Sequence, residues 1–166
     1  PLSRGSGQGS GKASPRECRV RSCAAVMLAR RQAASLAGPC SRRNASAAAS
    51  VVFIGSVASK VYVGSGVPYA MTKAAMDQMT RGLAVEWAEQ GITVNTVQPW
   101  YTQTDLAAPV LNDPARLAVI LAATPNKRIA APEDIAGIAM FLAGPAARHI
   151  TGTMIPVDGG FLAKGL

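Results

Sequence analysis

The order of hydrophobic and polar residues predicts three strands between residue 51 and the end of the sequence. Residues 51–54, Val-Val-Phe-Ile, are continuously apolar, which is typical of a strand buried on both faces. Apolar and polar residues alternate over 92–98, so we expect a second strand there, ending at Pro99. A third strand is expected over 153–157. Because Pro156 has no N–H to donate to a neighbouring strand, this strand should lie at an edge of the sheet.

Helices are predicted between these strands, and the alternation of strands with helices indicates a parallel α/β sheet. Pro68 suits the first turn of a helix, and apolar residues then recur every four positions to about Gln90. The predicted core-facing residues of this helix are Met71, Ala75, Met79, Leu83 and Trp87. Short helices are expected over 105–111 and 114–122, and Pro132 opens a further helix. The predicted core face of that helix comprises Ile135, Ile138, Phe141 and Leu142.

Composition and charge divide the chain near residue 50. Residues 1–50 contain nine Lys or Arg and one acidic residue, whereas residues 51–166 contain eight of each sign. The three cysteines, Cys18, Cys23 and Cys40, also lie in the first part, without Cys-x-x-Cys spacing or a nearby histidine, so no metal site is expected. We therefore expect two regions: a basic segment over 1–49 that is disordered or foreign to the fold, and a folded domain over 50–166.

The basic segment allows three interpretations. Arg- and Ser-rich, acid-poor sequence is typical of an organelle transit peptide or a disordered tail. Sequence foreign to the fold, for example from a wrong reading frame, has equal weight. An arm that binds nucleic acid is less favoured, because the segment contains no aromatic residue for base stacking. The apolar residues 24–28 predict a short helix, and no apolar run in the chain is long enough to span a membrane.

Candidate chemistry lies between residues 56 and 73. Tyr69 and Lys73 are one helical turn apart and share a face of the predicted helix. A phenol normally titrates near pH ~10, and a neighbouring ammonium and the positive end of a helix dipole both favour its charged form. Ser56 follows the C-terminal end of a strand, where open α/β sheets bind ligands, and its hydroxyl is suited to hold a carbonyl oxygen. The three residues together predict a general acid–base site.

This arrangement resembles the active site of the short-chain dehydrogenase/reductase family. Ser56 is followed thirteen residues later by the motif Tyr69-Ala-Met-Thr-Lys73, which is the spacing of that active site. Further segments resemble the family in the same order, namely 94–99, 99–104, 132–136 and 150–160. The resemblance covers 51–166 and implies the C-terminal half of a Rossmann fold, a doubly wound parallel sheet represented here by about three strands and flanking helices.

Three details resemble the plant tropinone-reductase-like branch of the family. Trp100 stands where most members have glycine, and the pair Glu86-Trp87 lies near the end of the long helix. The segment Asp77-Gln-Met-Thr-Arg81 also resembles that branch, although Asp77 stands where the branch often has asparagine. The resemblance therefore implies reduction of a ketone to a secondary alcohol.

The resemblance also implies residue roles and a cofactor. Ser56, Tyr69 and Lys73 are the implied catalytic residues, and the cofactor is NADP(H), with NAD as the alternative. The implied cofactor contacts are Tyr69, Lys73, Pro99, Tyr101, Thr102 and Thr104. Ser56, Val57 and Tyr101 are expected to contact a small ketone or alcohol substrate, and residues 105–121 to form a mobile lid.

The sequence departs from the family in its first half. The glycine-rich phosphate turn, the Asn-Asn-Ala-Gly segment and a catalytic asparagine are not recognised, since Gly5–Gly11 lacks the required spacing. We therefore expect a truncated or mis-assembled chain whose strand over 51–54 is an exposed edge that favours homo-oligomers. We also expect it to bind cofactor weakly.

Several broader expectations follow for this chain. We expect no nucleic-acid or membrane partner, and a cytoplasmic location, or a plastid location if residues 1–49 are transit-like. The alternatives to an active reductase are a non-catalytic remnant that self-associates and, more weakly, a nucleic-acid binder with a basic arm.

Overall fold

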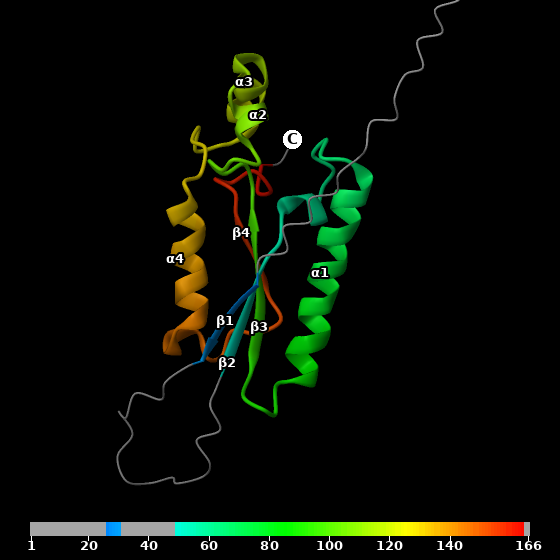
Figure 1. Ribbon diagram of the computed structural model, residues 1–166, viewed down its shortest axis with the longest axis vertical. Helices are drawn as coiled ribbons and strands as arrows, with labels where there is room; N and C mark the ends of the chain where they lie inside the picture. The colour runs from blue at the N-terminus through cyan, green and yellow to red at the C-terminus, as the bar shows by residue number, and fades with distance from the viewer. Residues whose placement is uncertain (1–25, 31–48, 165–166) are drawn as a thin grey trace, which may run out of the picture.

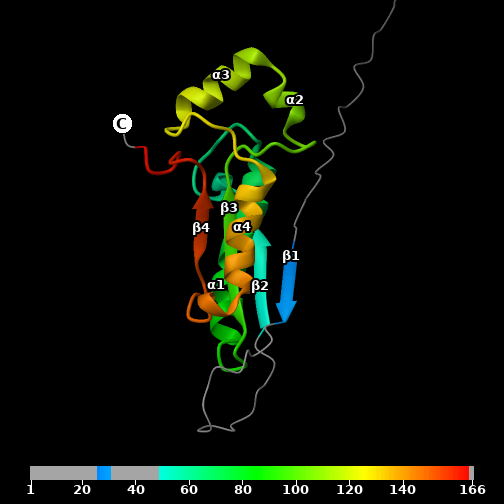
Figure 2. The same ribbon diagram turned by 90° about the vertical axis from the view of Figure 1, so that its left-hand side faces the viewer.

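The computed structural model describes residues 26–30 and 49–164, which form a four-stranded sheet with helices on both faces (Figures 1 and 2). The strands are β1 (Val26–Arg30), β2 (Ala49–Ile54), β3 (Thr93–Pro99) and β4 (Met154–Val157), and they lie in the order β1-β2-β3-β4. Strands β2, β3 and β4 run parallel, whereas β1 runs antiparallel to β2. The predicted fold class, a partial Rossmann-type α/β sheet with about three parallel strands and flanking helices, is confirmed.

Two long helices cover the two faces of the sheet. α1 (Val67–Glu86) connects β2 with β3 on one face, and α4 (Pro132–Ala143) precedes β4 on the other (Figure 1). The shorter helical elements are α2 (Ala108–Leu111), α3 (Pro114–Ala123) and the 3-10 helices η1 (Val57–Ser59) and η2 (Pro145–Ala147). α2 and α3 lie beyond the C-terminal end of β3 (Figure 2). Within the described ranges, every helix is too short or too polar to span a bilayer.

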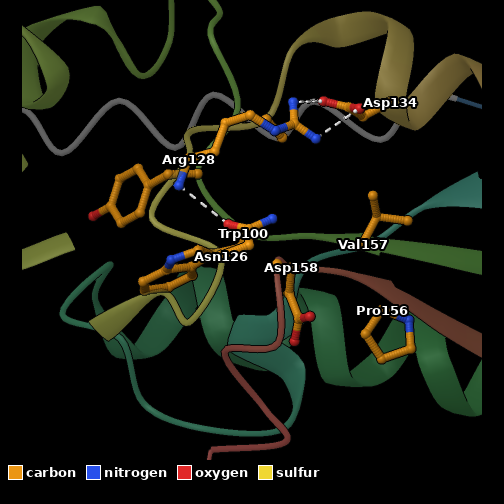
Figure 3. A pocket seen from close by; sticks show the side chains of 10 residues that line it. Trp100, Asn126, Arg128, Asp134, Pro156, Val157 and Asp158 are labelled. Atoms are coloured by element: carbon orange, nitrogen blue, oxygen red, sulfur yellow. Dashed lines mark hydrogen bonds and ion pairs between the residues drawn. The ribbon is translucent and has the colours of Figure 1, made fainter. Parts of the chain in front are cut away.

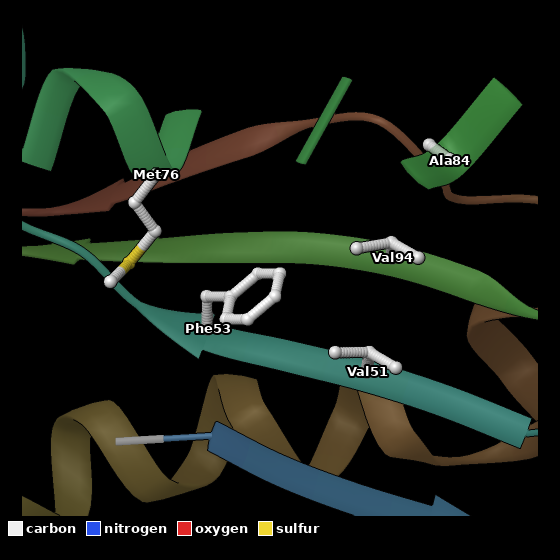
Figure 4. Close-up of a cluster of buried hydrophobic side chains, with 5 residues drawn as sticks. All are labelled: Val51, Phe53, Met76, Ala84 and Val94. Atoms are coloured by element: carbon white, nitrogen blue, oxygen red, sulfur yellow. The ribbon is translucent and has the colours of Figure 1, made fainter. Parts of the chain in front are cut away.

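The parallel strands lie between two apolar clusters. The cluster on the α1 side consists of Val51, Phe53, Met76, Ala84 and Val94 (Figure 4). The cluster on the α4 side consists of Val52, Val97, Ala139, Leu142 and Ala147. Successive side chains of β2 point to opposite faces, so its uninterrupted apolar sequence fills both clusters. The prediction of a strand buried on both faces is confirmed for residues 51–53.

The buried face of α1 differs from the face that its apolar residues predicted. Met71 and Met79 are 66% and 44% exposed and Ala75 is also exposed, so the prediction that these three residues face the core is wrong. Leu83 and Trp87 are partly buried against the sheet. The buried residues of α1 are instead Lys73, Met76, Asp77, Thr80 and Ala84. Thr80 and Asp77 have partners on β3, namely Thr96 at 2.6 Å between hydroxyl oxygens and Gln98 at 2.7 Å, whereas Lys73 donates to the carbonyl of Ile54 on β2. The face of α1 that packs on the sheet is therefore the one whose polar groups can bond to β2 and β3.

Two further predictions about the helices need correction. Phe141 of α4 is 44% exposed, whereas the adjacent Leu142 is fully buried. The α4 residues that pack on the sheet are Ile135, Ile138, Ala139 and Leu142, and Phe141 is not among them. α1 ends at Glu86 rather than near Gln90, and turns over 87–91 lead to Gly91, whose φ of +71° suits glycine.

β1 was not expected as a strand. The apolar residues 24–28 predicted a helix, but Val26–Arg30 is a strand that pairs antiparallel with β2, from Val26 opposite Phe53 to Arg30 opposite Ala49. The prediction of an exposed edge at 51–54 is therefore wrong, because β1 supplies partners for the backbone groups of β2. Residues 1–25 and 31–48 of the basic segment lie outside the described residues, and its last residue, Ala49, begins β2. At the other side of the described sheet, β4 is the edge strand that Pro156 predicted.

β3 is buried along most of its length although it contains several polar residues. The Asn95 amide donates to the carbonyl of Ile150 at 2.8 Å and accepts from the N–H of Thr153 at 3.2 Å. One residue earlier in β3, the N–H of Val94 donates to the hydroxyl of Thr151 at 3.0 Å. These bonds satisfy the buried polar groups and fix β3 against the segment that leads into β4.

Candidate active site

Ser56 begins the loop that follows β2. Its Oγ accepts a hydrogen bond from the N–H of Ala58 at 3.1 Å and so caps η1. Its carbonyl accepts from the N–H of Ser59 at 3.1 Å and from the hydroxyl of Ser59 at 2.9 Å. A hydroxyl that accepts one bond still has a hydrogen to donate. The half-buried Ser56 side chain is therefore fixed in place and suited to donate to a ligand oxygen.

Lys73 lies between the ring of Tyr69 and the end of β2. Its Nζ donates to the carbonyl of Ile54 at 2.9 Å and lies 5.6 Å from the centre of the Tyr69 ring. Lys73 is 5% exposed, whereas Tyr69 is half-buried in the first turns of α1. Because Ile54 precedes Ser56 by two residues, the ammonium connects the helix that carries the phenol with the strand that leads to the serine.

The segment after β3 forms a short extension of the sheet. Pro99 is the last residue of β3, and Thr102 forms an isolated parallel bridge with Ala130. The carbonyl of Tyr101 accepts from the N–H of Ala130 at 3.2 Å. Tyr101 and Thr102 are half-buried, and Thr104 is exposed before α2. The structure thus places the residues from Pro99 to Thr104 at the same C-terminal edge of the sheet as Ser56.

Trp100 connects three separate segments. Its ring stacks on Phe161, with centres 3.9 Å apart and planes 7° apart, and meets Tyr101 edge-on at 4.6 Å. Its Nε1–H donates to Thr124 Oγ1 at 3.1 Å. The resemblance implied only that Trp100 replaces the glycine usual in the family at this position. The ring fixes the loop after β3 to the end of α3 and to the C-terminal segment.

A surface hollow of about 320 Å³ lies beside the end of β4 (Figure 3). Its lining residues are Trp100, Tyr101, Asn126, Arg128, Ala130, Asp134, Pro156, Val157, Asp158 and Gly159. Arg128 and Asp134 form an ion pair at 2.6 Å. The pKa of Asp134 is lowered mainly by the hydrogen bond from Arg128 and next by the hydrogen bond from the N–H of Ala131. The hydrogen bond to Asp134 raises the pKa of Arg128.

The predicted site residues are distributed unevenly around this hollow. Tyr101 lines it, whereas Ser56, Tyr69 and Lys73 are not among its lining residues. Val57 is fully buried, so a contact between its side chain and a substrate would require the loop to rearrange. Ser56, Tyr69 and Lys73 therefore lie apart from this hollow, Ser56 just after β2 and the other two in the first turns of α1.

Comparison with known proteins now identifies the family. A family model described as enoyl-(acyl carrier protein) reductase matches residues 20–162. A tropinone reductase homolog of Arabidopsis thaliana is 43% identical over 121 residues, which are 73% of this chain and 46% of that protein. A chloroplastic tropinone reductase homolog of the same plant is 39% identical over 120 residues, which are 72% of this chain and 37% of that protein.

Solved structures agree with these sequence matches. A gluconate 5-dehydrogenase from Burkholderia cenocepacia, in complex with NADP and tartrate, superposes with a TM-score of 0.68 at 32% identity. The superposition covers 70% of this chain and 46% of that one. The chain therefore belongs to the short-chain dehydrogenase/reductase family.

The predicted branch is also confirmed, because relatives at 38–43% identity are tropinone reductase homologs. The chain spans about half the length of the relatives that it matches.

Proposed function

We propose that this chain carries the proton-transfer residues of an NADP(H)-dependent oxidoreductase that reduces a ketone to a secondary alcohol. The observation that carries the proposal is the position of Lys73, buried between the Tyr69 ring and the end of the strand that leads to Ser56. The ammonium of Lys73 reaches the C-terminal end of β2, and with the phenol of Tyr69 on α1 and the hydroxyl of Ser56 after β2 it is proposed as the donor set for a carbonyl oxygen.

The same residues fit the nicotinamide end of the cofactor. Lys73 and Tyr69 are proposed to bind the ribose hydroxyls, and the segment from Pro99 to Thr104, with Tyr101 and Thr102, the carboxamide. When bound, the reduced cofactor supplies hydride to the carbonyl carbon. An NADP-bound relative supports this cofactor, and NAD remains the alternative. The Arg- and Gly-rich residues before 26 lie outside the described residues, so the proposal concerns the nicotinamide end alone.

The proposed roles follow from the hydrogen-bonding capacity of each group. Ser56 donates its free hydroxyl hydrogen to the carbonyl oxygen, and Tyr69 donates its phenolic proton to that oxygen as charge develops on it. Lys73, whose Nζ lies 5.6 Å from the centre of the Tyr69 ring, is proposed to face the negative charge that remains on Tyr69 after the proton transfer. Ser56 and Tyr101 are the proposed substrate contacts.

Two matched tyrosine variants test the proposal. Oxidation of NADPH is followed by its absorbance with a panel of cyclic ketones. Tyr69→Phe removes one hydroxyl and is expected to lower kcat by about 10²–10⁴-fold, the contribution typical of a general acid. Tyr62→Phe makes the same change on a side chain that is 71% exposed and should leave kcat unchanged. Equal activity of Tyr69→Phe and the parent chain would refute the assignment.

The alternative is a non-catalytic remnant that self-associates. No turnover by the parent chain with any ketone would favour this alternative. We propose self-association for either case, because α1 exposes the apolar side chains of Val67, Met71 and Met79. Light scattering measures the molar mass of the assembly in solution. A Met71→Lys variant should shift that mass toward the monomer.

We also propose a cytoplasmic location, with a plastid as the alternative suggested by residues 1–49 and by a relative named chloroplastic. A fluorescent fusion of the chain, imaged with a plastid marker, distinguishes the two.

A further inference from the structure

Three polar side chains connect α1, β3 and the loop of Ser56 inside the protein. Gln98 is fully buried, and its Nε2 donates to Asp77 Oδ2 at 2.7 Å and to Ser59 Oγ at 2.8 Å. The Ser59 hydroxyl donates in turn to the carbonyl of Ser56 at 2.9 Å. A continuous series of hydrogen bonds thus runs from the middle of α1 to the backbone of Ser56.

This series of buried polar groups carries a cost in the free energy of folding. Asp77 is 4% exposed, and burial of a carboxylate and an amide costs free energy unless every polar atom is paired. Within the described part of the chain, Asp77 Oδ1 and Gln98 Oε1 have no hydrogen-bond partner. An apolar pair of similar volume would fill the same space without this cost. Stability alone therefore does not account for the two residues.

The series joins the two elements that carry the residues of the candidate site. Asp77 lies one helical turn after Lys73 on the buried face of α1, so the series links the helix of Tyr69 and Lys73 to the serine loop. A second contact holds the base of the loop, where the N–H of Gly55 donates to the carbonyl of Val97 at 2.7 Å. Misplacement of a reacting group by about 1 Å can lower a rate by about 10²-fold.

We propose that Asp77, Gln98 and Ser59 are positioning residues that fix Ser56 relative to Tyr69 and Lys73. This inference rests on the proposed function for its effect on turnover. Its structural part, that the series holds the serine loop, is independent of turnover. The two parts require separate measurements.

The kinetic measurement uses substitutions at Ser59. Ser59→Ala removes the hydroxyl that joins Gln98 to the Ser56 carbonyl, and it is expected to lower kcat by about tenfold with KM changed less than about twofold. Ser59→Thr keeps a hydroxyl and should restore most of kcat. Ser50→Ala is the matched control, because Ser50 Oγ is buried 3.0 Å from Thr93 Oγ1 at the opposite end of β2. It should leave kcat unchanged.

The structural measurement is hydrogen exchange of the full chain, followed by mass spectrometry of the peptides over 55–61. Ser59→Ala and Gln98→Met are each expected to raise exchange there by at least about threefold, and the double variant by no more than the larger single effect. Ser50→Ala should not raise it. If the parent chain lacks turnover, the proposed function fails while this measurement still tests the positioning. Unchanged exchange over 55–61 in Ser59→Ala and Gln98→Met, or parent-like kcat of Ser59→Ala in an active chain, would overturn the inference.

Discussion

The contacts of Trp100 allow its contribution to stability to be predicted from the structure. Trp100→Leu keeps an apolar side chain but removes the stacking on Phe161, the edge contact with Tyr101 and the bond to Thr124. Aromatic pairs contribute about 0.5–1.5 kcal/mol each beyond their buried area, and one neutral hydrogen bond contributes about as much. The expected decrease in the free energy of unfolding is therefore about 2–4 kcal/mol.

A second substitution separates the ring contacts from the hydrogen bond. Trp100→Phe retains an aromatic ring but cannot donate to Thr124. The Thr124 hydroxyl still donates to the carbonyl of Ile120 at 2.7 Å, so this substitution does not leave it without a partner. Trp100→Phe is therefore expected to cost only about 1 kcal/mol.

Urea unfolding followed by far-ultraviolet circular dichroism measures both variants, because the substitution itself alters fluorescence. The midpoint should move to lower urea with an unchanged slope, since the area exposed on unfolding is nearly the same. If Trp100→Leu unfolds within about 0.5 kcal/mol of the parent chain, the view of Trp100 as a link among three segments is refuted. Equal losses in both variants would show that the hydrogen bond, and not the ring, carries the effect.

Three further results are expected from substitutions elsewhere in the fold. Met71→Lys should change the free energy of unfolding by less than about 0.5 kcal/mol, whereas Met76→Lys should cost more than about 3 kcal/mol in the same urea assay, because only Met76 is buried. Gly55→Ala should cost about 1–3 kcal/mol by thermal unfolding, since an added Cβ would lie 2.6 Å from a threonine methyl of β3. Arg128 lowers the pKa of Asp134 in the folded chain, so its contribution to stability is present above the unfolded value near ~4 and is lost as pH falls through the lower folded value. Asp134→Asn should therefore weaken the dependence of the unfolding midpoint on pH in the acid range, and an unchanged dependence would contradict the ion pair.

The strands of the parallel sheet could be predicted because their signals are local. The apolar run at 51–54, the alternation before Pro99 and the proline in the last strand each report how one strand is buried or paired. The spacing of Tyr69 and Lys73 also predicted that the two side chains share a face of α1, where Nζ of Lys73 lies 5.6 Å from the centre of the Tyr69 ring. Such features depend on residue type and spacing, which the sequence contains.

The missed features depend on partners that are distant in sequence. The buried face of α1 could not be recognised from hydrophobicity, because Asp77 and Thr80 become favourable only beside Gln98 and Thr96. The pairing of Val26–Arg30 with β2 depends on chain geometry across an intervening segment. The packing of Trp100 on Phe161 joins residues sixty-one positions apart. None of these contacts has a periodic signal.

The polar buried face of α1 has a consequence for the folding of the chain. Before β3 is in place, the methionine side of the helix is the more hydrophobic one and would be preferred in any early collapse. The polar face of α1 can pack on the sheet only when the amide and hydroxyl groups of β3 are in place. β3 follows α1 in the chain and pairs with β2 between residues distant in sequence, such as Ser50 and Thr93. Local preference and final packing thus conflict at this helix, a form of frustration that slows maturation. Refolding intermediates that expose Met71 and Met79 should associate with one another. The yield of refolded protein after dilution from denaturant should therefore fall as protein concentration rises.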